Sequence, residues 1–119
     1  MTKYEILLCI FSYLDKAWRE EQNKSEEYLY YISNLNPSRW QGECTADPAY
    51  YQDFLTICNL FFTESECTPD EGFHYAKKYL DEYNIKEHND FSSNIDEVIS
   101  VFSKCTISEW REIYEKLKK

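Results

Sequence analysis

Apolar residues recur every three or four positions along most of this chain, which is the spacing of one face of an α-helix. The pattern predicts six helices separated by short polar segments. They cover residues 3–21, 26–35, 48–62, 69–83, about 91–103 and 107–117. The polar stretch 84–90 is expected to break the chain between the fourth and fifth helices.

The predicted helix starts carry residues that can satisfy free main-chain N–H groups. Thr2, Thr68 and Thr106 are each followed three positions later by a glutamate, which is the sequence of a capping box. Ser25 and Asp47 are suited to cap the second and third helices with their side-chain oxygens. Five of the six starts are therefore specified by local chemistry alone.

The second predicted helix is rich in tyrosine. Its aliphatic residues at positions 29, 32 and 35 are expected to face inward. Tyr28, Tyr30 and Tyr31 would then share the remaining sides, so at least one of them is expected to lie on the surface behind Glu26 and Glu27.

The helices resemble one unit used twice. Thr2-x-x-Glu5 followed by Tyr13-Leu14-Asp15 matches residues 68–81 at a constant offset of 66. We expect a single all-α domain over residues 1–119, in which halves 1–62 and 67–119 are two similar three-helix units packed as one compact bundle.

Composition agrees with helices and restricts the partners. Two glycines and three prolines are too few for a turn-rich β-sandwich or barrel, and 43% hydrophobic residues exclude a disordered chain. The net charge of −9 should repel nucleic acids and anionic membranes and attract a basic protein. The composition therefore predicts a protein partner, with no nucleic acid and no membrane, and leaves the oligomeric state open.

The cysteines favour a reducing compartment. The chain has five of them, an odd number, and no C-x-x-C pair. The apolar run Ile6 to Phe11 is too short for a signal peptide or a membrane span. We therefore expect a cytoplasmic protein whose cysteines act mostly as small hydrophobic residues.

Candidate catalytic and metal-binding groups are sparse. Glu71 and His74 have the E-x-x-H spacing of di-iron carboxylate bundles, but those sites need a second such motif, and the other histidine, His88, directly follows a glutamate. No cysteine has a sequence context typical of an activated thiol. No glycine-rich phosphate loop is present. The sequence predicts no enzymatic activity, no metal and no cofactor.

Exposed aromatic residues among carboxylates are suited to binding a basic protein, because the rings supply rigid contact area and the acids steer the partner. The acids concentrate after residue 61, and a loop of about ten residues precedes the third helix. The alternative interpretation of the acidic run is a solvated face. The predicted partner-binding residues are Trp40, Glu43, Glu64, Glu66, Asp70, Glu71, Tyr30 and Tyr31.

One segment resembles a known group of proteins. Residues 45–49 read Thr-Ala-Asp-Pro-Ala, Asp53 follows, and Tyr51 and Phe54 stand where the pattern T-A-D-P-A-x-W-x-D-W has tryptophan. The pattern is similar to that of small acidic helical bacterial immunity proteins of contact-dependent and other polymorphic toxin systems. Tyr13-Leu14 and Ile32-Ser33 fit the two preceding helices of that group more loosely. The resemblance covers about half the chain and lies in cap and core residues, so it carries over no toxin-contacting residue.

The resemblance implies an immunity protein, or antitoxin, that occludes the active or substrate-binding site of a basic toxin domain encoded next to it, such as a nuclease. Carboxylates would there take the place of nucleic-acid phosphates. Two alternatives remain open: a phage-type inhibitor that mimics nucleic acid against a host nuclease or an RNA-guided effector, and a helical scaffold for protein interactions.

Overall fold

The computed structural model describes residues 1–37, 43–91 and 94–118, and over these ranges it contains six α-helices. Apart from one isolated bridge between Pro37 and Thr45, the described residues form no strand pairing. The all-α fold class is confirmed. The helices are α1 (Lys3–Glu20), α2 (Glu26–Leu35), α3 (Pro48–Cys58), α4 (Pro69–Phe91), α5 (Asp96–Phe102) and α6 (Ile107–Leu117).

The predicted caps are confirmed and explain where the helices begin. Thr2 and Thr106 form complete capping boxes with the glutamates three positions on. Thr68 does the same at the start of α4. The Ser25 hydroxyl accepts from the N–H of residue 28, and an Asp47 carboxylate oxygen accepts from the N–H of residue 49 at 3.0 Å. Each cap satisfies a main-chain donor that has no partner inside the helix.

Three helix ends differ from the sequence-based boundaries. The predicted break at 84–90 is wrong, because α4 stays helical through these polar residues to Phe91. No glycine or proline interrupts this stretch, and Asn84 uses its side chain to receive the Ile95 N–H at 2.8 Å instead of ending the helix. As a result α5 begins only at Asp96.

The end of α3 also comes earlier than predicted, at Cys58 rather than residue 62. The N–H groups of Leu60 and Phe61 bond to carbonyls three residues back, as in the tighter 3₁₀ turn that often closes an α-helix. This turn points the Leu60 side chain into solvent, where it is 75% exposed, while Phe62 returns to the core.

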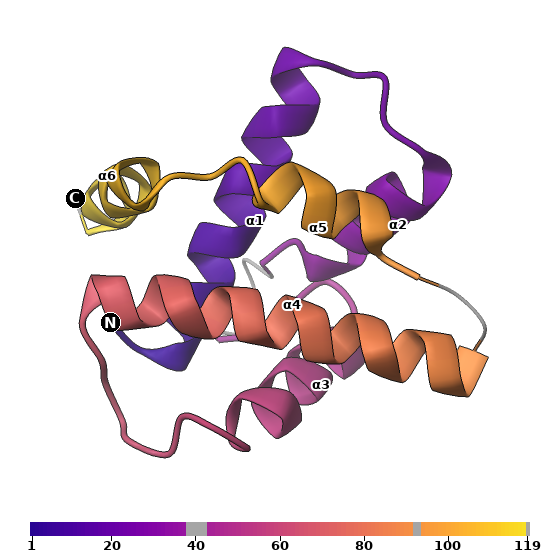
Figure 1. The fold of residues 1–119 in the computed structure, drawn as a ribbon. Helices are drawn as coiled ribbons and strands as arrows, with labels where there is room; N and C mark the ends of the chain where they lie inside the picture. Colours follow the sequence, from indigo (N-terminus) through magenta and orange to yellow (C-terminus); the bar gives the residue numbers. More distant parts are fainter. Residues whose placement is uncertain (38–42, 92–93, 119) are drawn as a thin grey trace.

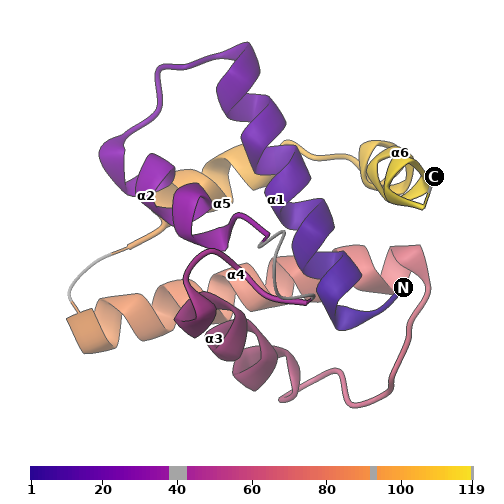
Figure 2. The ribbon, with the colours of Figure 1, turned by 180° about the vertical axis from the view of Figure 1, so that it is seen from behind.

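The two longest helices cross near their first turns. α4 runs across the whole molecule and α1 crosses it steeply, with α3 and α5 on opposite sides of α4 (Figures 1 and 2). At the crossing a Cβ added to Gly72 would lie 2.3 Å from the Met1 sulfur and 3.4 Å from Ile6 Cγ1. The missing side chain of Gly72 therefore lets the start of the chain pack against α4.

Contacts at this crossing join residues that the predicted duplication makes equivalent. Met1 and Cys67 exchange main-chain hydrogen bonds: the Cys67 N–H donates to the Met1 carbonyl at 2.9 Å, and the Met1 amino group donates to the Cys67 carbonyl. Ile6 and Gly72 also differ by 66 positions. Likewise α1 packs on α6 as α4 packs on α3. If a two-fold axis related the halves, contacts between residues 66 positions apart would lie at that axis. The duplication itself stays a prediction.

A single hydrophobic core receives buried side chains from all six helices. Trp110 of α6 is one of its largest members and is fully buried. Its ring lies 5.4 Å from Phe73 and 6.0 Å from Phe102, measured between centroids, and its indole N–H donates to the Pro69 carbonyl at 2.9 Å. Trp110 thus joins α6 to the first turn of α4.

We expect Trp110→Ala to lower the free energy of unfolding by about 3–5 kcal/mol, because a large buried ring is lost and its cavity cannot fully close. Urea denaturation measures the change. Trp110→Phe should cost less, since it keeps most of the packing. Leu117→Ala, at a side chain 39% exposed on the same helix, is the control and should cost less than about 1 kcal/mol. Equal losses for the tryptophan and leucine variants would contradict this view of the core.

Candidate partner-binding surface

The structure distributes the predicted contact residues over several places. Glu43, Glu64 and Glu66 are exposed, the last two in the connection between α3 and α4. Trp40 lies outside the described residues. The three exposed acids are accessible to a partner.

Two of the predicted acids have structural roles. Asp70 accepts two hydrogen bonds from the Arg111 guanidinium, at 2.9 and 2.6 Å, and this pairing lowers the pKa of its carboxyl group. Glu71 accepts the Thr68 N–H at 2.9 Å in the capping box, which lowers its pKa as well. Their charges are partly neutralised within the chain, so they are poorer steering groups than Glu64 and Glu66.

The prediction that at least one tyrosine of α2 lies on the surface is confirmed by Tyr30. The prediction that residues 29, 32 and 35 form the inward face and leave the other sides to the tyrosines is wrong, because Tyr28 and Tyr31 are buried as well. Tyr31 is only 2% exposed, whereas Tyr30 is 67% exposed and fits the predicted surface role. Leu29, expected to face inward, is half-buried. The helix presents its tyrosine side to the core because the neighbouring helices supply partners for the phenol hydroxyls.

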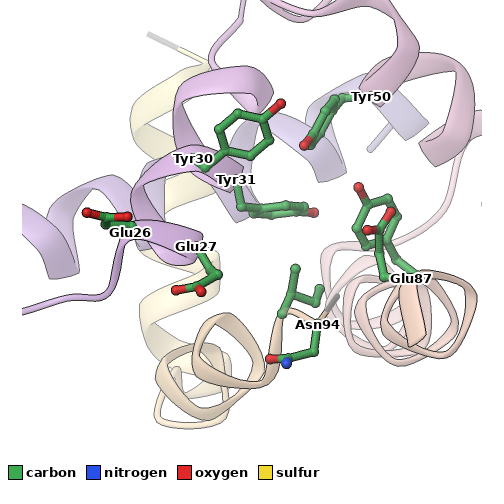
Figure 3. Close-up of a pocket in the computed structure, with 9 residues that line it drawn as sticks. Glu26, Glu27, Tyr30, Tyr31, Tyr50, Glu87 and Asn94 are labelled. Carbon is green, nitrogen blue, oxygen red and sulfur yellow. The ribbon is translucent and has the colours of Figure 1, made fainter. Parts of the chain in front are cut away.

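A pocket of about 340 Å³ opens beside Tyr30. It lies between α2, the start of α3, the second half of α4 and the residues leading into α5 (Figure 3). Four tyrosines, three glutamates, one asparagine and one isoleucine line it: Tyr30, Tyr31, Tyr50, Tyr83, Glu26, Glu27, Glu87, Asn94 and Ile95. These described lining residues include no lysine and no arginine, so the pocket is an aromatic hollow with a negative rim.

The rim and the floor come from different elements. Figure 3 shows the Tyr31 ring between Glu27 on one side and Glu87 on the other, with Asn94 across the space from the ring. Tyr83 and Ile95 are buried and belong to the floor, while Tyr30 stands at the exposed edge. The rings of Tyr31, Tyr50 and Tyr83 contact one another, at centroid distances of 5.5 to 6.2 Å.

Side-chain hydrogen bonds hold the elements of the pocket together. Asn84 of α4 donates to an Asp96 oxygen at 2.7 Å and accepts from the Ile95 N–H, which ties α5 to α4. Glu97 of α5 accepts from the Ser25 N–H at 2.9 Å and from the Ser25 hydroxyl, which ties α5 to the start of α2. The pocket is therefore formed by segments that are fixed to one another.

A hydrogen bond and ring contacts hold the inner tyrosines. The Tyr31 and Tyr79 hydroxyls lie 2.8 Å apart, and the Tyr50 ring packs on Tyr31 and Tyr83 at centroid distances of 5.8 and 6.2 Å. Burial raises the pKa of Tyr31, Tyr50 and Tyr83 above the ordinary phenol value. At neutral pH these phenols stay protonated and serve as uncharged walls, which leaves the negative charge to the glutamates.

Metal-ligating side chains, cysteines and long apolar helices can be located in the described residues. Across residues 1–37, 43–91 and 94–118, no group of three or more His, Cys, Asp and Glu side chains is gathered where it could hold a metal ion. All five cysteines are free, and Cys9, Cys58 and Cys105 are buried. None of the helices in these ranges combines the length and apolar character that crossing a bilayer requires.

The sequence indicates one edge of the pocket, where Glu26 and Glu27 precede Tyr30 and Tyr31. Tyr50, Tyr83 and Glu87 lie on other helices, and the pattern of apolar residues does not predict that they join this edge. A local signal existed, because Glu27–Tyr31 and Tyr83–Glu87 are both glutamate–tyrosine pairs four residues apart, which places each pair on one helix face. The expected break at 84–90 concealed the second pair.

Comparisons with known proteins add no further information about the site. No family model matches the chain, and neither the curated proteins nor the solved structures contain a match. Any function assigned to this chain therefore rests on the residues of this surface and on the resemblance carried by residues 45–54.

We expect the three buried thiols to resist alkylation in the folded protein. Burial raises the pKa of Cys9, Cys58 and Cys105 to about 12, so almost no thiolate is present near neutral pH. Iodoacetamide at about pH 8 should modify the half-buried Cys44 and Cys67 first, and the other three only in urea. Mass spectrometry of peptides gives the order. Native labelling of a buried thiol as fast as Cys44 would contradict the packing described.

We expect Tyr31→Phe alone to lower the free energy of unfolding by about 1–3 kcal/mol, because the buried Tyr79 hydroxyl loses its partner. The double variant Tyr31→Phe, Tyr79→Phe removes both hydroxyls and should lose less than the sum of the single variants. A double-mutant cycle from urea denaturation measures the coupling. Strictly additive losses would show that the two hydroxyls do not stabilise each other.

Proposed function

We propose that this protein is an immunity protein that binds and neutralises a cognate bacterial toxin domain, a basic nuclease being the best fit, by covering its active or substrate-binding site. One observation carries the proposal: an acid-rimmed tyrosine pocket lies open beside the exposed Tyr30. Aromatic residues in a well-packed pocket are the usual centres of binding energy in protein interfaces.

Two further features support this proposal. The chain carries a net charge of −9, which speeds encounter with a basic partner and disfavours an acidic one. Glu43, Glu64 and Glu66 are exposed in addition to the acids of the pocket, so carboxylates can face a basic domain over more than one patch. A nuclease surface that binds phosphates would meet these carboxylates in place of the phosphates.

The test is co-expression with the protein encoded next to this chain. Growth of the host reports neutralisation, and co-purification reports binding. We expect the wild-type chain to restore growth and to form a stable complex. If the neighbouring product is not toxic, or is toxic and neither rescued nor bound, the immunity function is wrong.

Within that complex we expect Tyr30→Ala to weaken binding by about tenfold or more, as truncation of a central aromatic residue usually does. Isothermal titration calorimetry gives the affinity. Leu60→Ala is the matched control, because Leu60 is another large exposed apolar side chain and does not line the pocket. Both variants should keep the melting temperature of the wild type. Equal effects of the two substitutions on affinity would place the binding surface elsewhere.

A further inference from the structure

The pocket beside Tyr30 has the charge pattern of a site for a single cation. Glu27 of α2 and Glu87 of α4 lie on opposite sides of the Tyr31 ring, and Glu26 adds a third carboxylate at the rim (Figure 3). The described lining residues carry no positive charge. An anionic group would be repelled by this rim, and an apolar group would shield the carboxylates from water without donating a hydrogen bond to them. A cation meets neither cost.

The walls favour a cation with a long apolar stem. The rings of Tyr30 and Tyr50 offer apolar surface between the rim and the floor, and the buried Ile95 side chain offers it at the floor. A volume of about 340 Å³ is at the small end of ligand pockets, which commonly span ~300–1,000 Å³, and suits one inserted side chain. Arginine and lysine both have such stems.

The arrangement of carboxylates and rings selects arginine over lysine. A guanidinium group is planar, weakly hydrated and has five N–H donors, so it can lie against tyrosine rings while it donates to carboxylates at both of its edges. The ammonium group of lysine is compact and strongly hydrated, and loses more on entering an aromatic hollow. The exposed Asn94 amide oxygen accepts the Asp96 N–H at 3.2 Å and keeps a second lone pair at the rim.

The pocket is ready for such a side chain before a partner arrives. Tyr31 is held by its hydrogen bond to Tyr79, and the rings of Tyr31, Tyr50 and Tyr83 pack against one another, so the inner rings need no rearrangement. Asn84 and Glu97 fix α5 to α4 and to α2. A preformed pocket saves the ordering cost that a flexible surface would incur on binding.

We infer that this pocket receives one arginine side chain of the protein partner, with the guanidinium group between Glu27 and Glu87 and the stem against Tyr30, Tyr50 and Ile95. The identity of the protein that carries this arginine rests on the proposed immunity function. The preference of the pocket for arginine does not, and it can be measured on the isolated chain.

The test is a titration of the ¹⁵N-labelled protein with N-acetyl-L-arginine amide, followed by NMR of backbone and tyrosine ring signals. The citrulline analogue is the matched probe, because it keeps the shape of arginine and lacks its charge. We expect saturable shifts that centre on residues 26–31, 50, 83–87 and 94–95. The citrulline probe should bind at least about tenfold more weakly, and N-acetyl-lysinamide should also bind more weakly, since charge-assisted hydrogen bonds are roughly twice as strong as neutral ones.

Two double variants with the same change in net charge separate the pocket from general acidity. Glu27→Gln with Glu87→Gln should weaken arginine binding by about tenfold or more. Glu64→Gln with Glu66→Gln removes two exposed carboxylates that do not line the pocket and should leave binding within about twofold. Circular dichroism confirms that both variants fold.

Each outcome decides the inference. Equal binding of arginine and citrulline probes, shifts spread over the whole surface, no saturable shifts, or equal effects of the two double variants would overturn it. If the pocket binds arginine but the neighbouring protein neither poisons the host nor forms a complex, the immunity function fails and the arginine site stands. Rescue of growth without arginine binding would support the immunity function and overturn the arginine site.

Discussion

The structure depends on the need of buried phenol hydroxyls for hydrogen-bond partners. A tyrosine in the core gains the hydrophobic contribution of its ring but loses free energy if its hydroxyl is left without a partner. Here Tyr28 donates to the Leu14 carbonyl at 2.6 Å, Tyr31 pairs with Tyr79, and Tyr4 donates to the Cys44 carbonyl at 2.9 Å. Among the described residues no buried side-chain nitrogen or oxygen lacks a partner. Each of these bonds joins segments far apart in the chain, so satisfying the hydroxyls also fixes the helix packing.

The same constraint shapes the pocket. Tyr31 turns inward to reach the Tyr79 hydroxyl, and its ring packs on the buried Tyr83 at 5.5 Å, so that the two rings form a floor between α2 and α4. The glutamate one turn away from each tyrosine then stands at the rim of that floor. A core requirement and a surface feature are thus coupled, because the bond that buries Tyr31 also brings Glu27 and Glu87 to the lining of one pocket. This coupling gives a physical reason for the pocket to be rigid and negatively charged at once.

The acids of the chain divide into those that stabilise the fold and those that face solvent. Glu71 and Glu109 cap helices, Asp70 pairs with Arg111, Asp96 receives Asn84, and Glu97 joins α5 to Ser25. Glu26, Glu27, Glu64 and Glu66 are exposed and take part in none of these bonds. The net charge of −9 therefore overstates the number of carboxylates that can attract a partner, because some of the acids are bonded within the fold. A proposed function that depends on charge has to be placed on the second group.

The sequence by itself determined the fold class and most helix starts. Thr2, Ser25, Asp47, Thr68 and Thr106 cap as predicted, because a cap needs only a side chain within three residues of the donor it satisfies. The period of apolar residues identified all six helices for the same reason, since a helix face is a local property.

Tertiary structure decided what depends on partners distant in the chain. Asn84 reads as a helix terminator, yet α4 continues because that side chain bonds to Ile95 and Asp96 eleven and twelve residues on. Tyr31 reads as a residue for an outer side of α2, yet it is buried because Tyr79 on another helix receives its hydroxyl. The pocket needs both of these outcomes, since one carries Glu87 to the rim and the other supplies the floor. The sequence pattern shows that a glutamate and a tyrosine share one face of α2 and that another such pair shares one face of α4. Only the packing of four segments brings these two faces together around one cavity.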